Sequence, residues 1–143
     1  MIRTATLQDA KAIRDLLDNL GYRASPAGVE KNLEVLLIHP DHHVLVYDVE
    51  AKVAGFIALY LVPSLAVDDG LAIINYLAVN EQFTRQGIGK ALEGAALAIA
   101  WENGCDRMQV HCRAEREQAQ GFYKSRGYRE YPVFFQKRLI YAE

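Results

Sequence analysis

The spacing of apolar and polar residues predicts a chain of alternating helices and strands. Residues 1–6 read as a short strand. Between residues 7 and 20, apolar side chains recur every three or four positions, which is the spacing of one face of a helix. Thr6 followed by Asp9 resembles a capping box at the start of this helix, and Gly21 is placed to end it.

The rest of the pattern predicts a mixed α/β order. A second helix is expected over residues 26–40, and two β-rich runs around a polar turn at residues 50–52 suggest a hairpin. Further along, we expect a loop at 63–70, strands at 71–79, 106–112 and 128–139, and helices at 87–103 and 115–126. The order β-α-α-β-β-β-α-β-α-β is that of a single mixed α/β layer structure.

Composition narrows the class of protein and its partners. With 143 residues, 51% of them hydrophobic, the chain matches one globular domain over residues 1–143. A net charge of -2 gives no general attraction to nucleic acids or anionic membranes. The start lacks the apolar core of a signal peptide, and no apolar run approaches the roughly 18 residues of a membrane span, so we expect a cytoplasmic protein. Cys105 and Cys112 form no CxxC pair and are expected to be reduced and buried.

A glycine-containing turn, "TRQGIGKA", connects a predicted strand to a predicted helix. It lacks the first glycine and the final Ser or Thr of a P-loop, and Leu92 stands where a dinucleotide fingerprint needs a small residue. Glycines at a helix N-terminus let the backbone approach a phosphate, with Arg85 and Lys90 adding charge. The turn is therefore either a pyrophosphate site or a plain connection without a ligand.

A second segment favours the ligand site. The turn from Thr84 to Gly89 is similar to the Gln/Arg-x-x-Gly-x-Gly/Ala signature of the GNAT superfamily, the GCN5-related N-acetyltransferases. The later run from Ala119 to Tyr128, "AQGFYKSRGY", resembles that family's Ala-x-x-Phe-Tyr-x-x-x-Gly-Tyr/Phe segment. The resemblance covers essentially the whole chain. It implies a mixed central sheet with helices on both faces, and acetyl-CoA as the acyl donor.

The resemblance also implies roles for individual residues. Residues expected to bind acetyl-CoA are Leu77, Ala78, Val79, Arg85, Gln86, Gly87, Ile88, Gly89, Lys90, Ala119 and Phe122. Tyr123 occupies the general-acid position, where a phenol protonates the departing thiolate; its alternative is a core aromatic. Residues expected on the acceptor side are Tyr22, Asn75, Tyr76 and His111.

Three positions depart from the family pattern. Thr84 replaces Gln or Arg, and the run "ERE" at 115–117 stands where many members have an Asn that contacts pantetheine. Asn75 replaces the Glu that serves many relatives as general base. A lysine-like amine has a pKa of about 10.4, so presenting it neutral at pH 7 costs roughly 4–5 kcal/mol. We expect Asn75 to orient the amine or a water, with His111 or that water taking the proton, unless His111 is structural.

The sequence predicts an N-acetyltransferase that acts on a primary amine of a small molecule or peptide by direct attack in a ternary complex. The alternative is a catalytically weakened CoA-binding or regulatory module. An enzyme acting on charged tRNA would need a positive face that the net charge does not suggest. We expect no metal site, because "HPDHH" at 39–43 reads as a polar turn, and Cys112 reads as structural. The aromatic last segment suggests a homodimer.

Overall fold

The computed structural model describes residues 1–112, 116–131 and 135–140. The chain divides into two units, Met1–His111 and Cys112–Glu143, and each is described by itself. The first unit contains, in chain order, β1 (Ile2–Thr4), the 3-10 turn η1 (Leu7–Asp9), α1 (Ala10–Asn19), α2 (Pro26–Ile38), β2 (His42–Val49), β3 (Lys52–Val62), β4 (Leu71–Val79), the 3-10 turn η2 (Glu81–Phe83), α3 (Ile88–Glu102) and β5 (Arg107–Val110). The second unit contains α4 (Glu117–Ser125).

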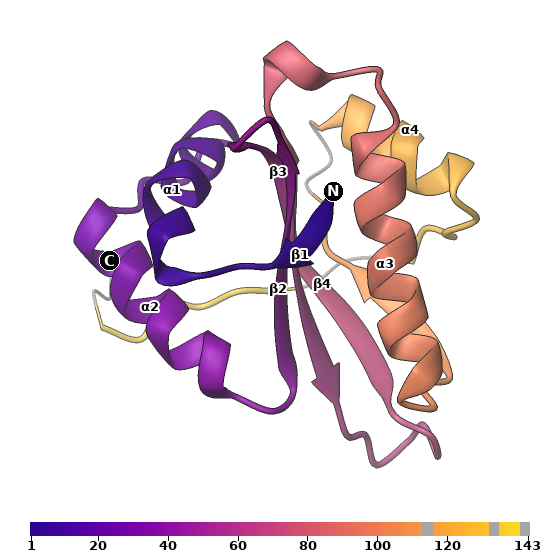
Figure 1. Ribbon diagram of the computed structural model, residues 1–143. Coiled ribbons are helices and arrows are strands. Elements are labelled where there is room, and N and C mark those ends of the chain that lie inside the picture. Colours follow the sequence, from indigo (N-terminus) through magenta and orange to yellow (C-terminus); the bar gives the residue numbers. More distant parts are fainter. Residues whose placement is uncertain (113–115, 132–134, 141–143) are drawn as a thin grey trace. The chain divides into compact units, whose positions relative to one another are not determined.

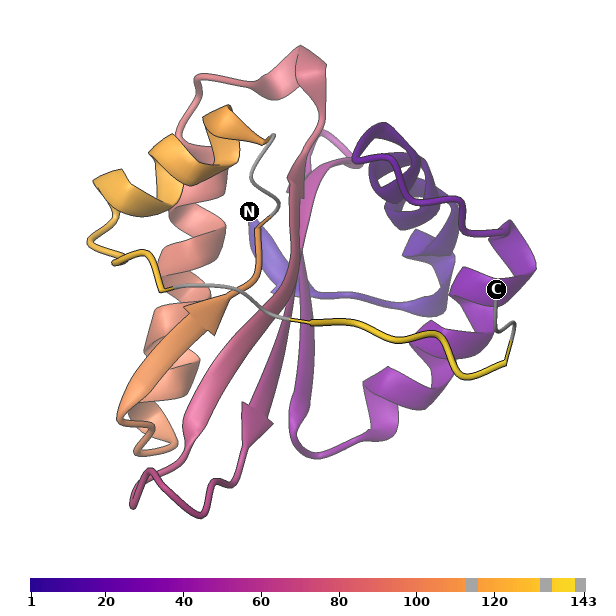
Figure 2. The ribbon, with the colours of Figure 1, turned by 180° about the vertical axis from the view of Figure 1, so that it is seen from behind.

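The first unit is built on a five-stranded mixed sheet in the order β1-β2-β3-β4-β5. The pairings from β1 to β4 are antiparallel, and β4 pairs with β5 in parallel. Helices α1 and α2 cover one face of this sheet and α3 covers the other, as Figures 1 and 2 show from opposite sides. The mixed sheet and the helices on both of its faces confirm the sequence prediction.

The core beneath α1 and α2 explains the helical spacing seen in the sequence. Ile13 and Leu16 of α1 and Val29 and Leu33 of α2 are all buried. They pack against the sheet residues Val44, Val46, Phe56, Ala58 and Ala78. Burying a large apolar side chain contributes about 1.5–3 kcal/mol, so this layer supplies much of the stability that holds α1 and α2 to the sheet.

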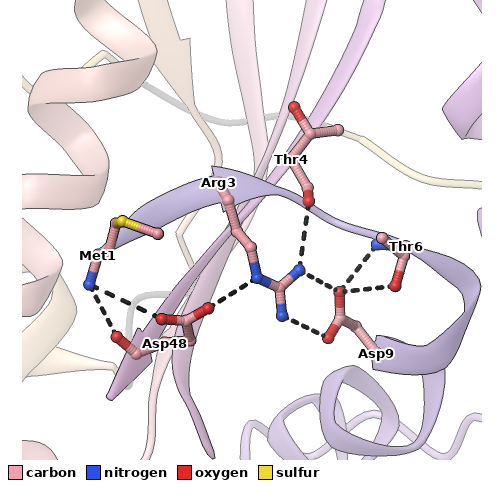
Figure 3. A network of polar contacts seen from close by, with 6 residues as sticks. All are labelled: Met1, Arg3, Thr4, Thr6, Asp9 and Asp48. Atoms are coloured by element: carbon pink, nitrogen blue, oxygen red, sulfur yellow. Dashed lines mark hydrogen bonds and ion pairs between the residues drawn. The ribbon is translucent and has the colours of Figure 1, made fainter. Parts of the chain in front are cut away.

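An ion-pair network fixes β1 against the start of the first helical segment (Figure 3). The Arg3 guanidinium contacts both carboxylate oxygens of Asp9, at 2.8 and 3.0 Å, and its Nε donates to Asp48 at 2.7 Å. The predicted capping box is present, since the Thr6 backbone N–H donates to the Asp9 carboxylate at 2.8 Å. Asp9 is only 6% exposed, and its hydrogen bonds to Arg3 hold its pKa below the usual range.

Two sequence predictions are wrong. Residues 128–131 and 135–139, the described part of the expected last strand, belong to no strand; Pro132 lies outside the described residues. Within the described part of this segment, Phe135 and Leu139 are 92% and 88% exposed, so these two side chains bury no face that would stabilise a strand. The second wrong prediction concerns Cys105 and Cys112, which were expected to be buried and are only half-buried. In the described part of the chain, no helix is both long and apolar enough to cross a membrane.

Candidate functional site

The middle of β4 contains a bulge at Asn75. Ala58 of β3 pairs with Tyr76, and the next residue, Leu59, pairs with Ile74, so Asn75 has no partner in the β3 ladder. An inserted residue reverses the face to which the following side chains point. Ile74 is 1% exposed, whereas Asn75 is exposed. The bulge therefore presents a polar side chain to solvent in the middle of an otherwise apolar strand.

The bulge also turns Tyr76 toward the side of the sheet that carries α1 and α2. Ala58, its ladder partner, belongs to the core on that side. The Tyr76 ring meets the Tyr22 ring edge to face, with 5.2 Å between centroids and 88° between planes. The end of α1 brings Tyr22 to this position. Gly21 adopts a left-handed backbone angle, with φ at 96°, and the Tyr22 N–H donates to the Leu17 carbonyl at 3.0 Å.

The Tyr22–Tyr76 pair forms an uncharged aromatic surface that is partly open to solvent. The two residues are 38% and 37% exposed. Burial, and secondarily the neighbouring Tyr22, raise the pKa of the Tyr76 phenol above its ordinary value. The Tyr76 hydroxyl is therefore protonated at neutral pH and can donate or accept a hydrogen bond without acting as an anionic base.

Among the described residues, the second half of β4 has no ladder partner on its other side. Pairing between β4 and β5 runs only from Leu71 with Arg107 to Ile74 with Val110. Within the part of the chain that the structure describes, no strand pairs with residues 75–79 on this side. An unpaired strand edge presents its donors and acceptors outward, so this edge can offer backbone N–H and C=O groups to a ligand.

The turn before α3 exposes the helix N-terminus. Residues 84–87 are exposed, and both Arg85 and Gly87 adopt left-handed backbone angles, at φ 64° and 78°. The first helical bond runs from the Ala91 N–H to the Gly87 carbonyl at 2.9 Å, so the N–H groups of the first turn have no acceptor within the helix. A Cβ atom built on Gly87 would meet nothing within 4 Å, which leaves this backbone open to a close ligand.

This helix start lies over the end of β4. A Cβ atom built on Gly55 would lie 2.8 Å from the Ala78 carbonyl oxygen and 3.3 Å from the Ile88 side chain. Gly55 thus allows the first residue of α3 to approach the sheet where β4 is unpaired. The predicted pyrophosphate turn and the predicted pantetheine strand are therefore neighbours in the first unit.

His111 follows β5 by one residue and is exposed. The last ladder pair joins Ile74 to Val110, so Asn75 and His111 are the first residues beyond the end of this pairing. The sequence places these two residues among the acceptor-side candidates, and the register brings them to the same end of the parallel ladder.

The second unit holds the other predicted site residues on and beside α4. Gly127, at φ 93°, ends the helix in a Schellman motif, with the Tyr128 N–H donating to the Tyr123 carbonyl at 3.0 Å. The Tyr123 ring packs edge to face on Phe122 and Tyr128, with centroids 5.3 and 5.5 Å apart. The run "FYKSRGY" therefore serves as a helix end that fixes the orientation of Tyr123. A pocket of about 320 Å³ at the start of α4 is lined by Arg116, Glu117, Gln118 and Ala119.

A family model decides the family. The model of the Acetyltransferase (GNAT) family matches residues 10–128. The chain belongs to the GNAT acetyltransferase family. An uncharacterised N-acetyltransferase of Chlorobaculum tepidum is 32% identical over 131 residues, which cover 90% of this chain and 75% of that protein.

Two further GNAT relatives carry names that specify different acceptors. A protein of Bacillus subtilis, provisionally named ribosomal protein bS18-alanine N-acetyltransferase, is 29% identical over 64% of this chain. An aminoglycoside acetyltransferase structure from a soil metagenomic sample matches with a TM-score of 0.80 and 25% identity, covering 97% of this chain and 95% of that one. The match to the Bacillus protein covers 57% of that protein's length. A separate match, to a chloroplastic GCN5-related N-acetyltransferase of Arabidopsis thaliana, covers 22% of that protein's length. Membership of the GNAT family therefore does not name the acceptor.

The first unit brings together most of the residues that the sequence singles out. Tyr22 and Tyr76 are in contact, and the turn at 84–90 lies beside residues 77–79. Ala119, Phe122 and Tyr123 belong to the second unit, and Glu115 of the "ERE" run lies outside the described residues. The bulge was missed, because residues 71–79 read as a continuous apolar strand in which only Asn75 is an exception.

The histidine-rich segment forms an aromatic cluster. His42 begins β2 and stacks on Tyr60 at 4.2 Å, and His39 meets the His42 ring at 4.6 Å. Desolvation, followed by the neighbouring His39, lowers the pKa of His42. Among the described residues, no group of three or more His, Cys, Asp or Glu side chains is arranged to hold a metal ion.

Proposed function

We propose that the chain transfers the acetyl group of acetyl-CoA to a primary amine by direct attack in a ternary complex. The observation that carries this proposal is the unpaired half of β4, at residues 75–79, beside the exposed N-terminus of α3. This juxtaposition supplies donors for an extended amide chain and for a pyrophosphate at adjacent places. The GNAT family membership adds the nature of the donor.

The residues of the α3 turn fit the pyrophosphate of CoA. The first-turn N–H groups lack helical acceptors, the Gly87 backbone is open, and Arg85 and Lys90 add two positive charges. We assign Arg85, Gln86, Gly87, Ile88, Gly89 and Lys90 to this role. Because the contacts come mainly from the backbone, Thr84 in place of Gln or Arg need not prevent binding.

The strand edge is assigned to the pantetheine and the thioester. N–H groups of Leu77, Ala78 and Val79 would hold the amides and polarise the thioester carbonyl, an oxyanion-type stabilisation. When bound, acetyl-CoA supplies an activated acetyl group. By their place in the family motif, Ala119 and Phe122 are assigned to the same arm of the donor.

Tyr123 is assigned as the general acid. Its phenol would give a proton to the departing sulfur, while Asn75 and Tyr76 orient the attacking amine or a water by hydrogen bonds. His111 or that water would take the proton from nitrogen. Tyr22 and Tyr76 would form the wall of the acceptor side.

A panel of amines tests this function. The purified chain is mixed with acetyl-CoA and amino acids, polyamines, aminoglycosides or peptides, and released thiol is followed. Turnover with any amine supports the enzyme. If acetyl-CoA raises the melting temperature but no amine gives turnover, the alternative function, a CoA-binding or regulatory module, is favoured. This alternative is motivated by Asn75, which stands where many relatives have a Glu.

The location, oligomeric state and partners of the protein are also proposals. We expect a cytoplasmic homodimer with a small-molecule or peptide partner and with neither nucleic acid nor a membrane surface. Tyr131, Phe135, Leu139 and Ile140 expose large apolar side chains that a second copy would cover. Light scattering that shows only a monomer at high micromolar concentration would remove the dimer.

A further inference from the structure

The two segments of the first unit that we assign to the acceptor carry no negative charge. Asn75 is the exposed bulge residue, and its neutral amide cannot take a proton from an amine at neutral pH. Residues 20–25, which contain Tyr22, and residues 75–79, which contain Tyr76, include neither Asp nor Glu. A polyamine or an aminoglycoside carries several positive charges and gains little from such a surface.

The described side chains next to Asn75 and Tyr22 in the first unit add no negative charge either. Burial raises the pKa of the Tyr76 phenol further above neutral pH, and the Tyr22 ring packed against it extends the aromatic surface. Arg23, which follows Tyr22, adds a positive charge. His111, which directly follows β5, is a further titratable side chain near the end of the β4–β5 ladder. The surface favours an acceptor that arrives largely uncharged at its reacting nitrogen.

The basicity of the acceptor then decides how much neutral amine is present. At pH 7, a lysine-type amine with a pKa of about 10.4 is neutral in about 1 molecule of 2,500. An α-amine, with a pKa of about 7.7–8.0, is neutral in about 1 of 6 to 1 of 11. The two classes differ in reactive fraction by more than about 200-fold before the enzyme contributes anything.

We propose that the acceptor is an α-amine, the amine next to a carbonyl group in a peptide N-terminus or an amino-acid amide, and not a lysine side chain or a polyamine. This inference rests on the proposed function. In the reaction, the neutral nitrogen forms a bond to the acetyl carbon, and the carbon–sulfur bond breaks. The sulfur leaves with the electron pair and gains one proton, and the nitrogen loses one.

Two matched peptide pools of random sequence test the proposal. One pool has free N-termini and acetylated lysines, and the other has acetylated N-termini and free lysines. Each is incubated at pH 7 with the protein and isotopically labelled acetyl-CoA, and mass spectrometry locates the label. Amino-acid amides in a parallel arm distinguish a small acceptor from a peptide. We expect initial rates at least about 100-fold higher for α-amines.

A pair of variants tests the cause. Asn75→Glu introduces a carboxylate, and Asn75→Gln introduces a side chain of the same length as Glu but without its charge. Because Asn75 is exposed and unpaired with β3, both variants should melt close to the wild type. We expect Asn75→Glu to raise the rate on the lysine pool by 10-fold or more relative to the α-amine pool, and Asn75→Gln to leave that ratio unchanged.

The outcomes separate this inference from the function on which it rests. Equal rates on the two pools at pH 7, or a preference for lysine, overturn the α-amine assignment and leave the acetyltransferase standing. An equal change of the pool ratio in both Asn75 variants overturns the assigned cause. Absence of label on every amine overturns the proposed function, and the inference with it.

Discussion

At the scale of single residues, Gly87 is the sharpest test of the donor site. Its φ of 78° strains any side chain, although a Cβ atom would meet no neighbour. Gly87→Val should place its side chain where a pyrophosphate would approach and remove most of the stabilisation by acetyl-CoA. At 100 times Kd, that stabilisation is about 2.7 kcal/mol, measured as a shift in melting temperature.

Gly104 provides the matched control. It ends α3 at φ 72° and is equally open, so Gly104→Val carries the same kind of backbone strain at the opposite end of the same helix. We expect Gly104→Val to destabilise the protein without changing its response to acetyl-CoA. An unchanged response in Gly87→Val would remove this turn as the pyrophosphate site.

Tyr123 is the residue-scale test of chemistry. Tyr123→Phe keeps the ring that packs on Phe122 and Tyr128 and removes only the hydroxyl. If that hydroxyl protonates the leaving sulfur, kcat should fall by about 10²-fold or more with acetyl-CoA binding retained. Single-turnover kinetics should be used, because product release can mask the chemical step. Wild-type single-turnover rates would exclude Tyr123 as the acid.

At the scale of elements, Gly55 controls how α3 lies on the sheet. Gly55→Ala would set a methyl group 2.8 Å from the Ala78 carbonyl oxygen, so backbone must move. We expect a loss of about 1–3 kcal/mol in the free energy of unfolding, together with weaker acetyl-CoA binding. Gly94→Ala, within α3 where a Cβ meets nothing, should instead be neutral or stabilising by up to about 1 kcal/mol. Comparable stability of the two variants would contradict this packing.

The Arg3–Asp9 pair gives a prediction of pH dependence. Because the pKa of Asp9 is lowered in the folded protein, its stabilisation is present above the ordinary value of about 3.9 and is lost as pH falls through the folded value. Asp9→Asn should cost about 1–3 kcal/mol at pH 7, and its difference from the wild type should shrink below pH 4. Urea unfolding across pH measures this.

An exposed carboxylate serves as the control for Asp9. Asp15 pairs with Lys11 and Arg14 at the surface, so Asp15→Asn should change stability little at any pH. If Asp9→Asn proves as mild as Asp15→Asn, the network in Figure 3 contributes no net stability.

Elements determined by nearby residues could be predicted from the sequence, and features determined by distant strands could not. The helices were predicted from apolar spacing and from end signals such as Thr6 and Gly21, which act within a few residues. The bounds of β4 were also predicted, at residues 71–79. Its bulge was not, because the register depends on β3, and one extra residue leaves no mark in a continuous apolar run. The described part of the expected last strand forms no strand, because β-propensity without a buried face does not specify pairing.

The candidate site shows the same division. The turn at 84–87 could be recognised from its glycines and basic residues, which are local signals. The left-handed backbone angle at Arg85 could not be predicted from the sequence, since few residues other than glycine adopt it. Contact between Tyr22 and Tyr76 depends on the bulge and on the end of α1 together, so neither segment alone predicts it.

At the scale of the whole molecule, the central claim is that the chain moves an acetyl group from acetyl-CoA to an amine nitrogen. The most direct measurement is mass spectrometry of an amine panel after incubation with isotopically labelled acetyl-CoA, run beside Gly87→Val. We predict label on nitrogen in the presence of the wild-type protein, and a strong reduction with the variant. Label on no amine, while acetyl-CoA still raises the melting temperature, would contradict the account and favour a binding module.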